Sequence, residues 1–237
     1  MNRPSDFKEW HRRQIDDYSK NEYAIFSTYA DVLHRVLQRV CSEHAKLGIV
    51  QSRPKAVSSF AEKVVRKWPA INDPIRQLTD LCGARVITHT QGEMEPICEF
   101  IETHFDIEEA EDVGSRLGAT EFGYTSFHYI VRLRAEALAG VSLPGDAGTV
   151  AEILETIGSR KAEIQVRTLM QHAWADVMHD RLYKTRVKVP QAWQHLAARQ
   201  AAILETADNE FSRIVEELDS YLVHYDAYMT PAEMSAE

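Results

Sequence analysis

The sequence predicts an α+β fold, close to the α/β class, in which helices flank a mixed β-sheet and long helices stand near both ends of the chain. Apolar residues recur at helical spacing over residues 6–47 and again over 191–225. Between these segments, short stretches with a period of two alternate with shorter amphipathic stretches. Strands that alternate with helices in this way are typical of a sheet with helices packed on it.

The composition is that of an ordinary globular protein. The chain has 237 residues, of which 44% are hydrophobic and 27% are charged, and its net charge is −9. This charge argues against a protein that coats DNA or other nucleic acid, so any basic site must be local. No stretch approaches the roughly 18 apolar residues that span a bilayer, and the N-terminus lacks the apolar core of a signal peptide. Three cysteines without a CxxC pair favour reduced thiols in a cytoplasmic protein.

The first helical segment, residues 6–47, has Ser5 as a cap and Gly48 as a stop. A single helix and two helices with a break near Asn21 both fit its pattern. The central region is expected to contain helices over 95–104, 150–157 and 169–183, and strands over 105–107 and 130–133. The acidic run 108–112 is expected to be a solvated loop. The expected organisation is an N-terminal helical segment (1–50), a central domain (51–188), and a C-terminal helix with a frayed tail (189–237).

A basic segment at 52–67 contrasts with the acidic chain, because five of its sixteen residues are basic and one is acidic. From about Val57 it should be helical, which places Ser59, Lys63 and Lys67 on one face at a spacing of four. Arg53 and Lys55 precede the start of this helix. Cations beside the free N–H groups of a helix start form a phosphate-binding arrangement, whereas the alternative is a solvated basic face.

Two predicted strands carry acids that could share a metal ion. In the stretch 162–168, a period of two puts Glu163, Gln165 and Arg167 in one row that is costly to bury and is therefore expected to face a cleft. The stretch 80–87 has Asp80 at the strand mouth and an inward Arg85. Two carboxylates on neighbouring strands are the minimal cage for one Mg²⁺ that carries a nucleoside triphosphate. The alternative is two ion pairs at strand edges.

A Gly-Tyr turn at 122–129 leads into the strand at 130–133. Such a turn exposes the ring of Tyr124 at the cleft, where a base could stack for roughly 1–3 kcal/mol. Ser126 and His128 are expected on the same side as this ring. The alternative is that Tyr124 is a core aromatic residue and His128 a core histidine.

Together these motifs resemble the synthetase domain of the RelA/SpoT alarmone family, over about residues 52–184. The family's motifs are present, in chain order, as Arg53, Lys55, Ser59, Lys63 and Lys67; as Asp80, Gly83 and Arg85; as Gly123, Tyr124, Ser126 and His128; as residues 163–168; and as Trp174, Ala175, His179, Tyr183 and Lys184. Five motifs in the right order are far more specific than any one of them.

The resemblance implies a nucleotidyltransferase-like mixed sheet and an ATP:nucleotide 3′-pyrophosphotransferase, which moves the β,γ-pyrophosphate of ATP to the 3′-hydroxyl of GDP or GTP to make an alarmone. It also implies roles for individual residues. Asp80 and Glu163 would bind Mg²⁺ and, with Arg85, form the catalytic group. The implied ATP-binding residues are Arg53, Lys55, Ser59, Lys63 and Lys67, and the implied acceptor-binding residues are Tyr124, Ser126, His128, Gln165 and Arg167.

The chain departs from the family pattern around the turn. Makers of guanosine tetraphosphate usually have Lys, Asn and Arg where this chain has Thr120, Phe122 and Thr125. Losing two cations and an amide weakens the case for GDP as acceptor. Toxin-type relatives instead modify the 3′ end of tRNA or make adenosine alarmones, and an inactive nucleotide-binding module is a third reading. We expect a small, single-domain synthetase without a hydrolase domain; an antitoxin partner and a homo-oligomer are both left open.

Overall fold

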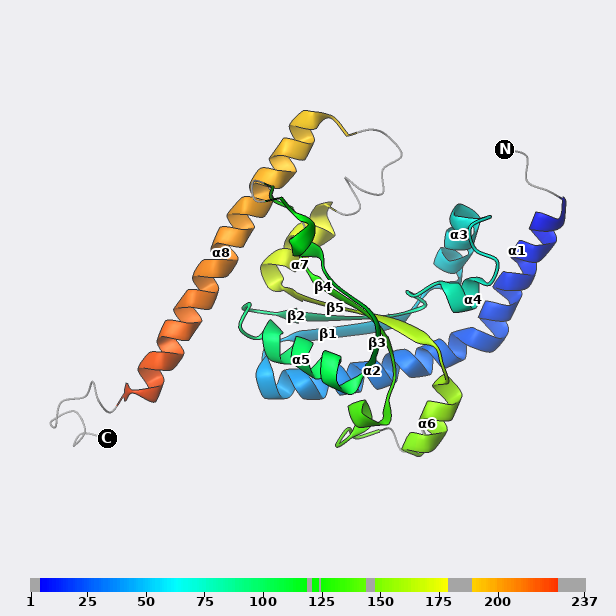
Figure 1. Ribbon diagram of the computed structural model, residues 1–237, viewed down its shortest axis with the longest axis horizontal. Helices are drawn as coiled ribbons and strands as arrows, with labels where there is room; N and C mark the ends of the chain where they lie inside the picture. The colour runs from blue at the N-terminus through cyan, green and yellow to red at the C-terminus, as the bar shows by residue number, and fades with distance from the viewer. Residues whose placement is uncertain (1–4, 119–120, 124, 144–147, 179–188, 226–237) are drawn as a thin grey trace.

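The computed structural model describes residues 5–225 except for four gaps, at 119–120, 124, 144–147 and 179–188 (Figure 1). It confirms the predicted mixed sheet, which has five strands in the order β1-β2-β5-β4-β3. The strands are β1 (Ile49–Pro54), β2 (Cys82–Thr88), β3 (Asp106–Asp112), β4 (Phe127–Arg132) and β5 (Lys161–Thr168). The central pair β2 and β5 is parallel, and the other neighbouring pairs are antiparallel.

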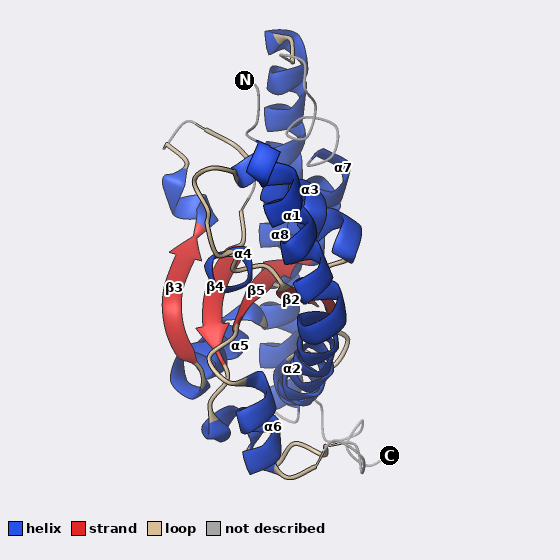
Figure 2. Cartoon of the chain, turned by 90° about the vertical axis from the view of Figure 1, so that its right-hand side faces the viewer, coloured by secondary structure: helices blue, strands red, loops and turns tan. Residues whose placement is uncertain are grey.

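Helices surround this sheet (Figures 1 and 2). The α-helices are α1 (Ser5–Asp17), α2 (Tyr23–His44), α3 (Val57–Lys67), α4 (Pro74–Gln77), α5 (Met94–His104), α6 (Val150–Ile157), α7 (Leu169–Met178) and α8 (Gln191–Val223). Short 3₁₀ segments lie at Val113–Arg116 and Ala135–Leu138. None of the helices in the described part of the chain combines the length and apolarity that crossing a membrane requires.

One face of the sheet is apolar and forms the main core. In β5, Ala162, Ile164 and Val166 are fully buried, and the register places Ile164 opposite Ala84 of β2 and Tyr129 of β4. The buried faces of α2 and α5 share this core cluster with the strands. Burial of about 25 cal/mol per Å² of apolar surface makes this face the main source of stability. Because strand side chains alternate, the other face carries the polar residues.

A π-helical turn joins α1 to α2 and connects the N-terminal helices to α3. This turn, Tyr18–Glu22, covers the place where the sequence allowed a break near Asn21. The Tyr18 ring is fully buried and stacks on Phe60 of α3, with ring centroids 4.2 Å apart. Its hydroxyl donates a hydrogen bond of 2.7 Å to the carbonyl of Lys55. The turn therefore holds both α3 and the segment that leads into it.

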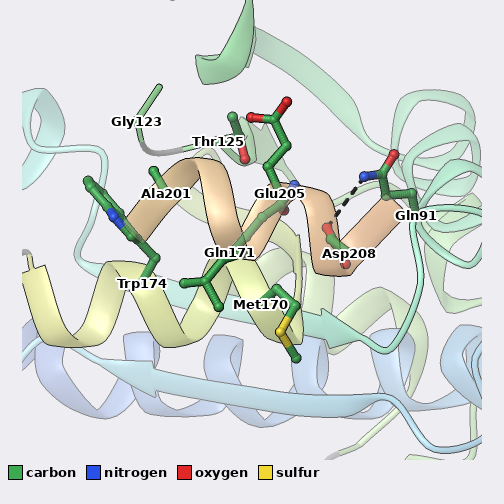
Figure 3. A pocket seen from close by; sticks show the side chains of 10 residues that line it. Gln91, Gly123, Thr125, Met170, Gln171, Trp174, Ala201, Glu205 and Asp208 are labelled. Atoms are coloured by element: carbon green, nitrogen blue, oxygen red, sulfur yellow. Dashed lines mark hydrogen bonds between the residues drawn. The ribbon is translucent and has the colours of Figure 1, made fainter. Parts of the chain in front are cut away.

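The long helix α8 is attached to the body by α7 and by a buried polar cluster. The Trp174 indole of α7 donates to the Ala197 carbonyl of α8 at 3.1 Å. Further along α8, the buried Asp208 accepts hydrogen bonds from Thr168 (2.8 Å) and Gln91 (3.4 Å) (Figure 3). A pocket of about 30 Å³, room for a water molecule, adjoins this cluster. The C-terminal part of α8 extends away from the sheet in Figure 1, and its apolar residues there are exposed.

Several sequence expectations need correction. The acidic run 108–112, expected to be a loop, forms most of the edge strand β3, whose acids stay largely exposed while its backbone pairs with β4. Strand β1 was not predicted, and Arg53, expected on the turn that leads into α3, lies in this strand, which has no fully buried residue to mark it in the sequence. The expected helix over 169–183 is described as far as Met178, and the rest falls outside the described residues. The expected helices at 150–157 and 95–104 are confirmed, the latter within one residue.

The buried carboxyl of Asp208 predicts a specific pH dependence of stability. Burial raises its pKa above the ordinary value; the hydrogen bonds from Thr168 and Gln91 oppose the rise without cancelling it. A raised folded-state pKa means that the unfolded chain loses this proton first, so stability falls as pH rises from about 4 to the folded-state pKa and then levels off. Asp208→Asn keeps an accepting oxygen but removes the charge. We expect wild type to lose stability relative to this variant over that pH range.

Urea unfolding of wild type and Asp208→Asn at a series of pH values between 4 and 8 measures this difference. Asp219→Asn, which changes an exposed acid on the same helix, is the matched control and should follow wild type. A constant difference between wild type and Asp208→Asn at every pH would contradict the prediction.

Candidate active site

The polar face of the sheet gathers the predicted site residues from three adjacent strands. In the register of the sheet, Gln165 of β5 lies opposite Arg85 of β2 and His128 of β4. Glu163 lies opposite Gly83, where a Cβ atom would meet nothing within 4 Å. The space above Gly83 is therefore open, and it is bordered by polar side chains.

Asp80, just before β2, is held between two lysines. Its Oδ2 lies 2.8 Å from Nζ of Lys55 and 2.7 Å from Nζ of Lys63, and the three side chains are 18–22% exposed. Burial opposes ionisation of Asp80, but the hydrogen bonds and charges of the two ammonium groups outweigh it and hold the pKa of this carboxyl below its usual value. The Lys55 amide also donates to the Leu81 carbonyl at 2.8 Å, which fixes the two segments to each other.

Glu163 is oriented by its neighbours on the same face. The Gln165 side-chain amide donates to Glu163 Oε1 at 2.6 Å, and Nδ1 of His128 lies 3.7 Å from the same oxygen. Burial lowers the pKa of His128, the charge of Glu163 raises it, and the charges of Arg167 and Arg116 lower it, with a net shift below the usual value. His128 is therefore neutral near pH 7 and can act as a hydrogen-bonding group without carrying a charge.

A second charged cluster lies where α7 folds back over the sheet. Asp176 of α7 lies 3.7 Å from Nη1 of Arg85 and 3.8 Å from Nη2 of Arg167, both measured to Oδ1. Its Oδ2 lies 3.5 Å from Nε2 of His172, one helical turn earlier. We did not predict Asp176 or His172 from the sequence. Their spacing of four on the polar side of a helix that follows directly after the Arg167 strand was the available signal.

The acids present fit a divalent cation that is also held by substrate. Asp80 Oδ1 is buried and has no hydrogen-bond partner among the described residues, so it can accept a ligand. Glu163 is on the strand next to β2, beside the open space over Gly83. The described residues contain no cluster of three or more His, Cys, Asp or Glu side chains suited to a metal. Mg²⁺ commonly binds one or two carboxylates together with substrate phosphates, which matches this pair.

The other predicted site residues are not brought into these two clusters. Arg53, Ser59 and Lys67 are exposed, on β1 and α3. Ser126 is buried, and its hydroxyl donates to the Val166 carbonyl at 3.1 Å, so it also joins β5 to the turn before β4. Tyr124, predicted to stack on a base, lies outside the described residues, as do His179, Tyr183 and Lys184.

The environment of His128 yields a direct test of this geometry. Removing the negative charge in Glu163→Gln should lower the pKa of His128 further, because Glu163 is the neighbour that raises it. Arg116→Gln should move the pKa in the opposite direction. Titration of the imidazole Cε1–H resonance by NMR in wild type and both variants measures the shifts. Identical titration curves for wild type and Glu163→Gln would show that the two groups are not close.

Comparisons with known proteins find relatives that cover most of the chain. A family model described as the region found in RelA / SpoT proteins matches residues 52–188. The chain is 24% identical over 180 residues to GTP pyrophosphokinase YjbM of Bacillus subtilis (strain 168), covering 76% of this chain and 77% of that protein. It is 22% identical over 208 residues to GTP pyrophosphokinase YwaC of the same strain, covering 84% and 91%.

Solved structures show the same fold. The crystal structure of small alarmone synthetase 1 from Bacillus subtilis matches with a TM-score of 0.65 at 21% identity, covering 86% of this chain and 99% of that one. The structure of smu.1046c from Streptococcus mutans UA159 matches with a TM-score of 0.63 at 19% identity, covering 84% and 96%. With the family model spanning more than half of its length, the chain belongs to the RelA/SpoT family.

Proposed function

We propose that the protein is an ATP-dependent pyrophosphotransferase that moves the β,γ-pyrophosphate of ATP to the ribose 3′-hydroxyl of GDP or GTP. The observation that carries this proposal is the Lys55–Asp80–Lys63 group, in which two cations hold an acid that keeps a free oxygen. Asp80 lies just before β2, the strand that pairs with the Glu163 strand. The two curated relatives are named GTP pyrophosphokinases. Small alarmone synthetase 1 of Bacillus subtilis has been solved with its product pppGpp and with AMPCPP.

Transfer of a pyrophosphate group depends on positioning and charge neutralisation more than on covalent chemistry by the protein. In this proposal Lys55 and Lys63, which both contact Asp80, also bind the phosphate oxygens of the donor. A bound Mg²⁺, held by Asp80 and Glu163, would supply further neutralisation of the phosphate charge. Arg85, two residues after Gly83 on the same face of β2 and opposite Gln165, would add a further cation for the phosphates.

The acceptor hydroxyl needs a group that orients it and can receive its proton. Glu163 is suited to this role because Gln165 fixes one of its oxygens and the open space over Gly83 adjoins it. A neutral His128 beside Glu163 donates or accepts a hydrogen bond without repelling or attracting the acceptor's phosphates by charge. Tyr124 is proposed to stack on the acceptor base.

A second candidate acceptor is the 3′ end of tRNA. The residues at the turn favour it, because Thr125 and Phe122 stand where guanosine-tetraphosphate makers usually have polar or cationic groups. The Phe122 side chain is 46% exposed, which leaves an apolar ring available for a base to stack on. A tRNA end would need further phosphate contacts, for which the basic segment 181–188, outside the described residues, is the sequence candidate.

The acids predict the first test of activity. Asp80→Asn and Glu163→Gln each remove one charge with little change in shape, so transfer should fall roughly 100-fold or more, about 2.7 kcal/mol in barrier. The measurement is transfer of label from ATP in the presence of Mg²⁺. Glu99→Gln, an exposed acid on α5 at the opposite face, is the matched control and should keep wild-type turnover. Near-full activity in either site variant would remove that residue from the mechanism.

The acceptor is identified by offering GDP, GTP, AMP and deacylated tRNA separately with labelled ATP. We expect label in GDP or GTP and none in tRNA. Charge reversal at Lys184, Arg186 and Lys188 should then change guanine-nucleotide turnover little, since those cations matter only to a long polyanion. Label in tRNA, with steep salt dependence and loss in the triple variant, would replace the guanosine acceptor by tRNA. No label in any acceptor would leave a nucleotide-binding module.

A further inference from the structure

Asp176 faces two arginines that come from different strands of the sheet. Arg85 of β2 and Arg167 of β5 are diagonal neighbours on the polar face, since Arg85 pairs with Gln165 and Arg167 with Ile87. One oxygen of Asp176 lies 3.7 and 3.8 Å from their nearest guanidinium nitrogens. Two guanidinium groups that converge on one point form a site for an anion with several oxygens, such as a phosphate.

The contact between Asp176 and the arginines is loose. Separations of 3.7 and 3.8 Å exceed hydrogen-bond length, whereas Arg–carboxylate pairs with good geometry reach about 2.7–2.9 Å. The Asp176 side chain is 59% exposed, while that of Arg167 is 3% exposed. The carboxylate therefore stands at the mouth of the site and retains contact with water. A phosphate that formed direct hydrogen bonds to both guanidinium groups would have the stronger claim on them.

The helix that carries Asp176 has a fixed position. Trp174 of α7 is buried and forms a hydrogen bond to α8. Helix α7 begins directly after β5, whose last residue, Thr168, forms a hydrogen bond to Asp208. Retreat of the carboxylate therefore needs only a change of side-chain rotamer toward solvent. His172, the neighbour of the second carboxylate oxygen, does not neutralise it, because burial and the nearby charges of Arg167 and Arg85 lower the pKa of His172 despite the opposing charge of Asp176.

We propose that Asp176 is an intramolecular competitor for phosphate. It occupies the Arg85–Arg167 anion site in the free protein and must leave when a polyphosphate binds. That the competing anion is the phosphate of a nucleotide rests on the proposed function. It thereby sets nucleotide affinity lower than the arginines alone would give. A free protein with its arginines already neutralised also binds stray anions less.

The opposite role makes the opposite prediction. If Asp176 served to hold the arginines in the orientation that substrate needs, its removal would loosen them and weaken phosphate binding. Competition requires that removal of the charge strengthens binding. The sign of the change in affinity therefore separates the two roles, and a binding measurement is needed because turnover alone would mix them.

The test is calorimetric titration with inorganic tripolyphosphate, which binds through phosphate oxygens alone and needs no catalysis. We expect Asp176→Asn to bind it about fivefold more tightly than wild type, the size of effect that one partly exposed ion pair supplies. Asp176→Ser, with a smaller side chain and the same loss of charge, should also bind more tightly. Glu99→Gln, which makes the same change in net charge at the opposite face, should match wild type.

Unchanged or weaker binding of tripolyphosphate in both Asp176 variants would overturn the proposal. Its failure is distinguishable from failure of the proposed function, which is read from label transfer by wild type. If wild type transfers label to a nucleotide but the variants do not bind tripolyphosphate more tightly, only the competition by Asp176 is rejected and the proposed function stands. If both variants bind tripolyphosphate more tightly but wild type transfers label to no acceptor, the competition by Asp176 is supported and the proposed enzymatic function is rejected. In an active enzyme, the same variants should lower the KM for ATP more than they change kcat.

Discussion

The alternation of side chains along β5 is the constraint on which the rest of the structure depends. Its apolar residues, Ala162, Ile164 and Val166, are fully buried and require a place at the centre of the sheet. A shift of register by one residue would turn Glu163 and Gln165 into the apolar core and the apolar residues onto the polar face, at a cost of many kcal/mol. The core therefore fixes which face is polar. The candidate catalytic side chains on the strands point to that face because the residues between them are held in the core.

Around this face, the stability of the site and that of the N-terminal helices depend on the same contacts. Asp80 would be costly to bury alone, and two ammonium groups within 2.8 Å offset that cost. One of them belongs to Lys55, whose carbonyl accepts from Tyr18 in the π-helical turn between α1 and α2. Packing of α1 and α2 against α3 is therefore coupled to the position of the cations, and residues outside the family's matched region contribute to the site.

The sequence predicted the features that periodicity and motif spacing determine, namely the central strands and the candidate site residues. Strands β2 and β5 were predicted because burial on one face leaves a period-two pattern. The motifs predicted Lys55, Lys63, Asp80 and Glu163 as site residues, and the structure brings both lysines to Asp80. The edge strand β3 was predicted only at its start, over 105–107. Its continuation through residues 108–112 was missed because these acids stay largely in solvent and leave no apolar pattern, while their backbone pairs with β4. The Asp176 cluster was missed because the spacing of His172 and Asp176 indicates only that they share a helix face, whereas their contacts with Arg85 and Arg167 depend on how α7 folds back over the sheet.

The distribution of charge explains how an acidic protein can hold a site for polyphosphate. Arg85, Arg167, Lys55 and Lys63 gather on one face, yet each is within 4 Å of an acid of the same chain, Asp80 or Asp176. Pairing of this kind lowers the cost of bringing four cations together in a fold without substrate. The two acids differ in what they can do next. Asp80 is mostly buried and has an oxygen without a hydrogen-bond partner among the described residues, so we propose that it stays in place as a metal ligand when phosphate binds, whereas the half-exposed Asp176 would turn into solvent. On this proposal, clustered cations need a counter-anion at both positions, and Asp80 provides one that remains as a ligand while Asp176 provides one that phosphate replaces.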